Sequence, residues 1–205
     1  MDKERFEKQI AFCLELDKEK EIFRQTHITG KNRRENDAEH AWHMALMAVV
    51  LREYANREFD LTRALLMILL HDVVEIDAGD TYAYDQVQKE TQAEREQAAA
   101  DRLCGMLPED QAKTFRELWQ EFEDYKTPEA CFAHTMDNFQ PMLLNDCNGG
   151  GDWIRHGVRR SQVEERNKKT PDGSEEIWEY MKTILDKHVE KGTLLNDREE
   201  KNGRS

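Results

Sequence analysis

Apolar residues recur every three or four positions along most of the chain, the spacing of one face of an α-helix. No segment alternates apolar and polar residues convincingly enough to predict a β-strand, and no internal repeat is visible. We therefore predict an all-α protein with about seven or eight helices. The predicted helices are a first one around Phe6–Leu14, followed by 38–56, 61–70, 91–107, 110–125, 127–144, 162–168 and 174–189.

The run Leu61–Leu70 is apolar on nearly all sides, which predicts the central and most buried helix. Thr127-Pro128-Glu129 is typical of a helix start, because proline is well tolerated in the first turn. Glycine breaks the pattern near residues 30, 79 and 150, and residues 79–88 are predicted to form a loop. We predict one helical domain over residues 1–191. A polar tail that frays follows over residues 192–205.

Composition narrows the class of protein. The chain has 205 residues, which suits one domain with a full core. No apolar run approaches the roughly 20 residues that span a bilayer, and residues 1–5 lack the apolar core of a signal peptide. The four cysteines form no CxxC pair and are predicted to be reduced thiols. These features predict a cytoplasmic protein without a membrane segment.

Charge narrows the class of ligand. The formal net charge of −13 disfavours binding to a nucleic-acid polymer, whose phosphates would be repelled. A small anionic substrate is compatible with this charge if a local basic cluster receives it. Residues 31–34, which include Arg33 and Arg34, form such a cluster, and Arg24 precedes it.

Ionisable residues interrupt the apolar pattern at three places. The run 64–70 ends in His71-Asp72, and Glu75 and Asp80 follow closely. Burying such groups costs several kcal/mol unless they are paired or bind a metal. Adjacent residues of an α-helix point about 100° apart, so His71 and Asp72 could share one ion only near a helix end or distortion. The other two places are residues 35–43 and Asp137.

These clusters predict one divalent metal site. Imidazole and carboxylate ligands suit Zn, Mn, Fe, Co or Ni. Pro141 lies four residues after Asp137 and cannot donate a helical hydrogen bond to its carbonyl, which loosens the helix where that carboxylate would reach inward. Taken alone, however, Asp137 could be a packing acid paired with an arginine.

The first cluster contains two histidines. We favour His40 as the ligand, because it follows an acidic turn that could cap a helix, and we expect His43 to support the site from a neighbouring helical face. His43 remains the alternative ligand. The remaining histidines are predicted to be hydrogen-bonded structural residues: His27, His134, His156 and His188.

Glu39-His40, His71-Asp72 and the distant Asp137 together resemble the HD-domain metal-dependent phosphohydrolases. Residues 33–40 and 71–80 resemble more closely the branch that contains the 5′-deoxynucleotidases, and the resemblance extends from about Phe23 to Lys191. It implies that residues 1–191 form a single HD-type helical bundle that binds one divalent metal through four side chains. Those ligands would be His40, His71, Asp72 and Asp137.

The resemblance also assigns residues around the metal. It implies that Glu75 takes part in proton transfer and that Asp80 supports the site. The family's phosphate-contacting arginine corresponds best to Arg24. A tryptophan follows this arginine in the bacterial deoxynucleotidase, whereas Gln25 stands here, so the resemblance does not assign the contact to the base.

We therefore expect hydrolysis of nucleoside 5′-monophosphates, with deoxyribonucleotides as the substrate. Glu75 lies four residues after His71, where it could orient a water or protonate the leaving oxygen. Arg24, with Arg33 or Arg34, could neutralise the phosphate.

Three alternatives remain at this point. The same metal site could cleave another phosphate ester or a pyrophosphate, such as a nucleoside triphosphate. The metal could instead be non-catalytic in a helical binding module, or the chain could be a helical interaction protein. Trp119 and Trp178, expected to be exposed on the late helices, would support a homodimer.

Overall fold

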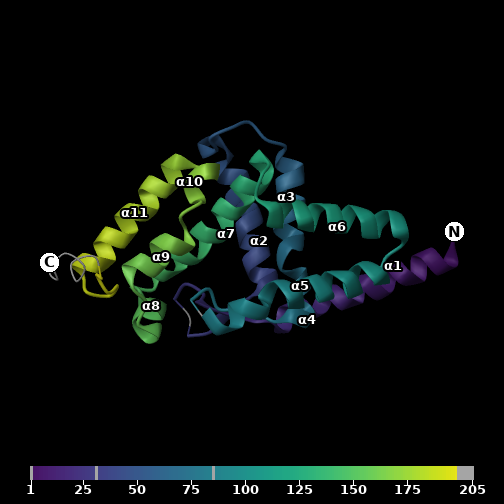
Figure 1. Cartoon of the computed structure of the whole chain (residues 1–205), viewed down its shortest axis with the longest axis horizontal. Helices are drawn as coiled ribbons and strands as arrows, with labels where there is room; N and C mark the ends of the chain where they lie inside the picture. Colours follow the sequence, from purple (N-terminus) through teal and green to yellow (C-terminus); the bar gives the residue numbers. More distant parts are fainter. Residues whose placement is uncertain (1, 31, 85, 198–205) are drawn as a thin grey trace.

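The computed structural model describes residues 2–30, 32–84 and 86–197. Helices dominate it, and the all-α prediction is confirmed. Figure 1 shows α7 (Pro128–Cys147) near the middle, with α1 (Lys3–Leu16) and α11 (Glu175–Glu190) at opposite ends of the molecule. The other long helices are α2 (Asp37–Leu51), α3 (Leu61–Leu70), α5 (Gln86–Met106) and α6 (Glu109–Asp124).

Short elements connect these helices and build most of the functional region. The short α-helices are α4 (Glu75–Ala78), α8 (Gly151–His156), α9 (Arg160–Arg166) and α10 (Thr170–Gly173). The 3-10 turns are η1 (Asp17–Glu21), η2 (Arg52–Tyr54) and η3 (His71–Val74).

A small antiparallel ribbon precedes α2, and the prediction of no strand was wrong here. β1 (Phe23–His27) pairs with β2 (Arg34–Asn36), with Phe23 opposite Asn36 and His27 opposite Arg34. The strands are short and mostly polar, and most of their residues are only partly buried. Backbone pairing rather than an alternating apolar face holds them together, so the hydrophobic pattern carried no signal for them.

The most buried helix is α7, not α3 as the apolar pattern predicted. Leu66 and Leu69 of α3 are 43% and 46% exposed, whereas α7 contacts α2, α3, α6, α10 and α11. The sequence pattern did not predict this burial, because several of the buried side chains of α7 are polar. They are accommodated inside because most of them form hydrogen bonds with neighbouring segments. The buried polar residues of α7 are Thr135, Asp137, Asn138, Gln140 and Asn145.

Among the residues that the structure describes, two apolar clusters form the core. The larger one joins α2, α3, α7 and α11 around Phe132, Met136 and Met181, and the smaller one joins α1, α5 and α6 around Leu103 and Phe115. Trp119 is only 5% exposed within the smaller cluster, and Trp178 packs against the larger one. The expectation that these tryptophans are exposed was therefore wrong, because each lies on the apolar face of an amphipathic helix.

The chain remains packed beyond residue 191, where we predicted the domain to end. Leu194 is buried in the larger core, and Leu195 forms a bridge with Arg159. Residues 198–205 of the predicted tail lie outside the described residues. Within the described part, no helix combines the length and apolarity needed to cross a bilayer.

Candidate metal centre and adjoining cleft

His40 is positioned by the start of α2. The Asn36 side chain accepts a hydrogen bond from the Glu39 N–H at 2.9 Å, and the Glu39 carboxylate accepts one from the Asn36 N–H at 3.2 Å. This reciprocal cap fixes the first helical turn. His40 follows directly and is fully buried.

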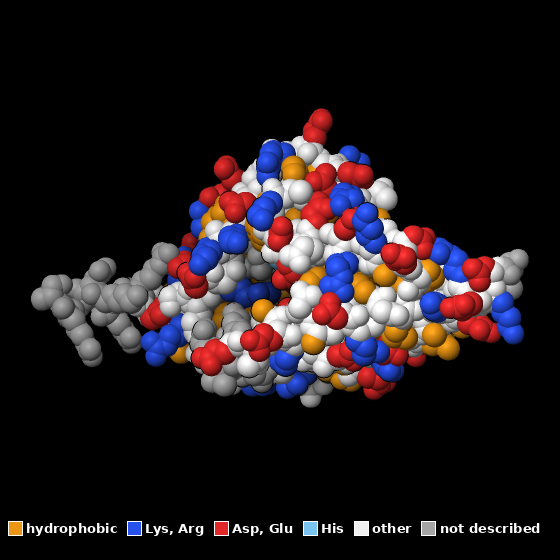
Figure 2. Space-filling model, turned by 45° about the vertical axis from the view of Figure 1, so that its right-hand side comes forward, with side chains coloured by type: hydrophobic (Ala, Val, Ile, Leu, Met, Phe, Trp, Pro, Cys, Tyr) orange, Lys and Arg blue, Asp and Glu red, His pale blue; other side chains and the backbone are white. Residues whose placement is uncertain are grey.

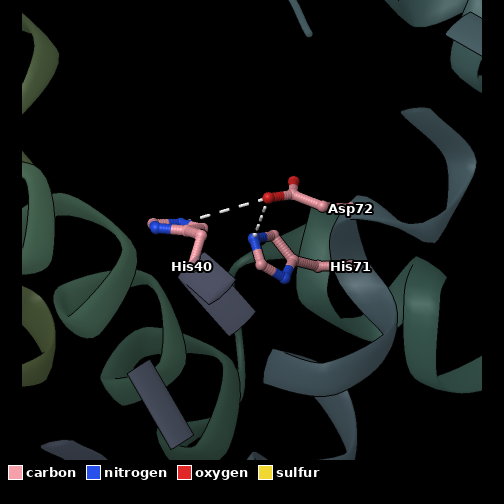
Figure 3. A group of neighbouring side chains, drawn as sticks. All are labelled: His40, His71 and Asp72. Atoms are coloured by element: carbon pink, nitrogen blue, oxygen red, sulfur yellow. Dashed lines mark ion pairs between the residues drawn. The ribbon is translucent and has the colours of Figure 1, made fainter. Parts of the chain in front are cut away.

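His71 and Asp72 lie where an α-helix changes into a 3-10 turn. Such a change lets two adjacent side chains point to the same side. The α-helix α3 ends at Leu70, and the chain continues as the 3-10 turn η3. Asp72 Oδ2 lies 3.1 Å from His71 Nε2 and 4.0 Å from His40 Nε2, as Figure 3 shows. One ligand atom from each of these three residues lies within 4.8 Å of the others.

Asp137 joins the cluster from α7, the helix that contains Pro141. Its Oδ1 atom lies 3.2 Å from His40 Nε2, and its Oδ2 atom accepts a hydrogen bond from Arg166 Nη2 at 3.3 Å. The structure therefore brings together the four predicted ligands from three separate stretches of chain.

The ring nitrogens of the two histidines are suited to a cation. His71 Nδ1 contacts the Ile68 carbonyl at 2.8 Å and His40 Nδ1 contacts Gln140 Oε1 at 3.0 Å. Both partners are acceptors, so each Nδ1 carries a proton, and the neutral form of each ring would have its lone pair on Nε2. His71 Nε2 is buried and lies 3.1 Å from Asp72 Oδ2, an atom that can only accept unless a proton or a cation lies between them. Such lone pairs beside carboxylate oxygens match the ligands of a divalent transition metal.

The charges of the cluster show the same need for a cation. Burial of His71 disfavours its charged form, but the Asp72 charge raises its pKa to about 9. Burial likewise disfavours the Asp72 carboxylate, yet the His71 and Arg24 charges lower its pKa. Protons on the imidazoles thus balance the buried carboxylates, and a bound metal would displace those protons.

Arg24 reaches the cluster from β1. Its Nη1 donates to Asp72 Oδ2 at 2.7 Å and to Asp37 Oδ1 at 3.3 Å, and its Nη2 lies 3.8 Å from Asp137 Oδ1. Burial opposes the charge of the guanidinium, but Asp72 and Asp37 raise its pKa. The ribbon that the hydrophobic pattern missed is therefore the element that holds this arginine beside the candidate ligands.

Glu75 and Asp37 form a carboxyl pair next to the candidate ligands. Glu75 begins α4, is 7% exposed and is hydrogen-bonded to Asp37. Burial, with the Asp72 and Asp37 charges, raises the pKa of Glu75, and burial raises that of Asp37 to about 7. This pair retains a proton near neutral pH. Sequence reasoning missed Asp37, although its place in the acidic turn before His40 was a usable signal.

The cluster opens into a cleft with two lobes. The larger lobe has a volume of about 400 Å³ and is lined by His71, Asp72, Glu75 and Asp137, among others. The smaller lobe has a volume of about 90 Å³. Figure 2 shows a hollow with Lys or Arg side chains inside it. Both lobes are lined by Arg24, Asp80, Thr81, Ala83, Asn138 and Arg166.

Asp80 therefore lies where the two lobes meet. It follows Gly79, whose φ of 73° turns the chain at the end of α4. Burial raises the pKa of Asp80, while the Arg24 charge lowers it to a smaller extent.

Arg33 and Arg34 do not line either lobe. Both are exposed, and Arg33 forms a two-bond contact with Glu39 at 2.6 and 2.8 Å. Lys31, of the same basic cluster, lies outside the described residues. Arg166 of α9 occupies the cleft instead. No motif surrounds Arg166 in the sequence, and only the approach of α9 to α7 brings it to Asp137.

His43 faces away from the metal cluster. Its Nδ1 atom lies 3.1 Å from Gln140 Nε2, and the same Gln140 nitrogen donates to Glu35 Oε2 at 2.8 Å. Gln140 in turn contacts His40, so His43 lies behind the candidate ligand. This arrangement leaves His40 as the histidine of α2 that reaches the other three ligands.

Comparison with known proteins identifies the family of this chain. A family model described as the HD domain matches residues 16–178. The 5′-deoxynucleotidase HDDC2 of Bos taurus is 34% identical over 110 residues, 53% of this chain and 52% of that protein. The Homo sapiens HDDC2 is 32% identical over 111 residues, 54% of this chain and 53% of that protein. The chain thus spans about half the length of these curated relatives.

Solved structures match over a larger share of the chain. The crystal structure of a predicted metal-dependent phosphohydrolase from Magnetospirillum magnetotacticum is 44% identical, with a TM-score of 0.89, and the match covers 93% of this chain and 96% of that one. An HD-domain phosphohydrolase from Listeria innocua is 19% identical, with a TM-score of 0.57, over 88% of this chain and 85% of its own. The second likeness shows the fold alone.

Proposed function

Because the chain belongs to the HD domain family, we propose that it is a metal-dependent phosphohydrolase that removes phosphate from nucleoside 5′-monophosphates. Deoxyribonucleotides are the proposed substrate class. The observation that carries this proposal is the meeting of two imidazoles and two aspartates at the wall of a cleft that also contains two arginines. Relatives named 5′-deoxynucleotidase support the substrate class.

The proposed metal ligands are His40, His71, Asp72 and Asp137. When bound, a divalent transition metal lowers the pKa of water and withdraws charge from a phosphate group. Co, Mn, Fe, Ni and Zn all suit this donor set. His71 is held in its ligand orientation by its hydrogen bond to the Ile68 carbonyl, and His40 by its bond to Gln140.

Glu75 is the proposed acid–base group. It lies beside Asp72, lines the larger lobe and has its pKa raised by burial. A buried carboxyl that keeps its proton near neutral pH can donate it to the leaving oxygen of the nucleoside. We propose that Asp80 supports the substrate where the lobes meet.

Arg24 and Arg166 are the proposed phosphate-binding residues. Both line the cleft, and each already contacts a candidate metal ligand, Arg24 through Asp72 and Arg166 through Asp137. A planar guanidinium can bind two phosphate oxygens at once, which neutralises charge and fixes orientation. Arg33 and Arg34 lie outside the cleft and are left out of this assignment.

We also propose that the enzyme is a homodimer that acts in the cytoplasm. Trp42, Leu46, Val49 and Val50 are spaced along one face of α2 and are 62%, 47%, 45% and 70% exposed. Contiguous apolar patches of this kind are typical of contacts between proteins. The four free cysteines support a reducing compartment. Sedimentation of wild type and of Val50→Asp tests the dimer, and the variant should shift toward monomer.

Phosphate release is the test of the activity. Protein reconstituted with Co²⁺ or Mn²⁺ should release inorganic phosphate from deoxynucleoside 5′-monophosphates, and Asp72→Asn should lose both metal and activity. Asp17→Asn, an exposed aspartate in η1, is the matched control and should keep both. No release from any nucleotide with any divalent metal would refute the activity. Pyrophosphate or triphosphate as the product would move the substrate to a nucleoside triphosphate.

A further inference from the structure

The smaller lobe of the cleft has the composition of a pocket for a flat ring. Its walls include Tyr82, Tyr84 and Trp153, with Met142 and Val163 among its other apolar lining residues. The hydroxyl of Tyr84 is hydrogen-bonded to the Trp153 side chain, so the polar atoms of these two rings satisfy each other. The volume of about 90 Å³ is several times what one water needs.

Two buried amide oxygens distinguish this lobe from an ordinary apolar pocket. Asn145 on α7 and Asn167 at the end of α9 both line it and are only 7% and 3% exposed. The Oδ1 atom of each has no hydrogen-bond partner among the described residues. A buried acceptor without a donor costs free energy, so these oxygens are suited to a ligand that brings N–H groups.

The orientation of both amides is fixed by their other ends. Asn145 Nδ2 donates to the Pro141 carbonyl at 3.2 Å, and Asn167 Nδ2 donates to the Val163 carbonyl at 2.7 Å. A flipped amide would place its oxygen against a carbonyl oxygen, which no proton could bridge. Both side chains must therefore keep the nitrogen toward their own helix and the oxygen away from it.

We propose that the smaller lobe binds the nucleobase of the substrate and selects bases that carry an exocyclic amino group, such as adenine and cytosine. This inference rests on the proposed function for its substrate class. The lobes share Arg24, Asp80 and Arg166, so a nucleotide with its phosphate at the metal cluster can extend its base into the smaller lobe. Thymine and uracil carry a keto oxygen in place of that amino group, and it would face the two amide oxygens, acceptor against acceptor.

The test compares two nucleosides that differ in one amino group. Calorimetry with the metal-loaded protein measures binding of 2′-deoxyadenosine and of purine 2′-deoxyriboside, neither of which has a phosphate to release. We expect about tenfold tighter binding of deoxyadenosine, because a pocket built to accept hydrogen bonds discriminates against a ligand that lacks the donors. In Asn145→Ala and Asn167→Ala the ratio should fall toward one, while exposed Asn32→Ala should keep it.

The outcomes separate this inference from the proposed activity. Equal binding of the two nucleosides to the wild type, or no binding of either at millimolar concentration, overturns the inference even if phosphate is released. Amino-dependent binding without phosphate release supports the inference and refutes the activity. If the alanine variants do not fold, the wild-type comparison alone decides.

Discussion

Two histidine–aspartate clusters of the folded chain have buried histidines beside an aspartate, but they differ in where their protons lie. At the C-terminal end, His188 Nε2 contacts Asp146 at 2.8 Å and His188 Nδ1 contacts Thr193 Oγ1 at 2.6 Å. The neutral ring can donate from Nε2 to the Asp146 carboxylate and accept at Nδ1 from the Thr193 hydroxyl. Each of these two contacts then contains one proton. His188 is thus fully satisfied without any ligand, and it ties the end of α11 to α7.

In the metal cluster, neutral histidines cannot place a proton in every contact. With the Nδ1 protons of His40 and His71 turned to other acceptors, both Nε2 lone pairs face aspartate oxygens. Acceptors that face acceptors need extra protons or a cation between them. Burial and a nearby aspartate do not distinguish a structural histidine from a candidate ligand. The positions of the protons on the two ring nitrogens do distinguish them.

The largest expected effect breaks the metal cluster and leaves the structural one intact. His71→Gln removes a candidate ligand, and we expect kcat/KM for phosphate release to fall about 10³-fold, together with loss of metal. Metal analysis and steady-state kinetics measure both. His188→Gln is the matched control and should keep its metal content and the activity of the folded fraction. Full metal content in His71→Gln would remove that residue from the ligand set.

The next prediction concerns the contribution of His188, the structural histidine, to the free energy of unfolding. His188→Ala leaves Asp146 and Thr193 without their shared partner inside the core, and we expect a loss of about 2–3 kcal/mol in the free energy of unfolding. Urea denaturation measures it. Exposed His156→Ala should change stability by less than about 0.5 kcal/mol. An equal small change in both variants would mean that the His188 contacts contribute nothing to folding.

A third histidine extends the comparison to pH. His134 lines the larger lobe, yet its Nε2 atom contacts the Phe122 carbonyl at 2.8 Å, and burial lowers its pKa to about 4 from the usual 6.5. The unfolded chain therefore takes up this proton first as the pH falls, and the stability contributed by the neutral ring is present above pH 6.5 and lost toward pH 4.

Between pH 7 and pH 5 this loss should be about 2 kcal/mol in the free energy of unfolding. Other groups of the cleft also titrate, so the measurement is the difference between wild type and His134→Gln at the two pH values. The variant should lose less stability on acidification. If the two proteins have the same pH dependence, His134 is not held neutral in the folded state.

Part of the fold and of the metal cluster could be predicted from the sequence, and part could not. The apolar run Leu61–Leu70 predicted a helix with the bounds that the structure has, because polar residues, Asp60 and His71, stand at both ends of the run. Ionisable residues at the end of an apolar run indicated His71 and Asp72, and Pro141, four residues after Asp137, indicated that aspartate. The acidic turn at the start of α2 favoured His40 over His43. The ribbon that carries Arg24, and Arg166 itself, gave no signal, because both depend on segments that meet only in the folded chain.

The smallest effect concerns the arginines on which the sequence pattern and the structure disagree. Arg33 is exposed and its guanidinium is occupied by Glu39, so Arg33→Ala should leave kcat/KM within about twofold of wild type. Arg166→Ala removes a donor that faces the cleft, and we expect KM to rise about tenfold with a smaller change in kcat. Kinetics on one deoxynucleoside monophosphate compares the two. A larger loss in Arg33→Ala than in Arg166→Ala would mean that the substrate approaches over the rim of β2, since exposed charges act on the encounter with a ligand more than on the bound state.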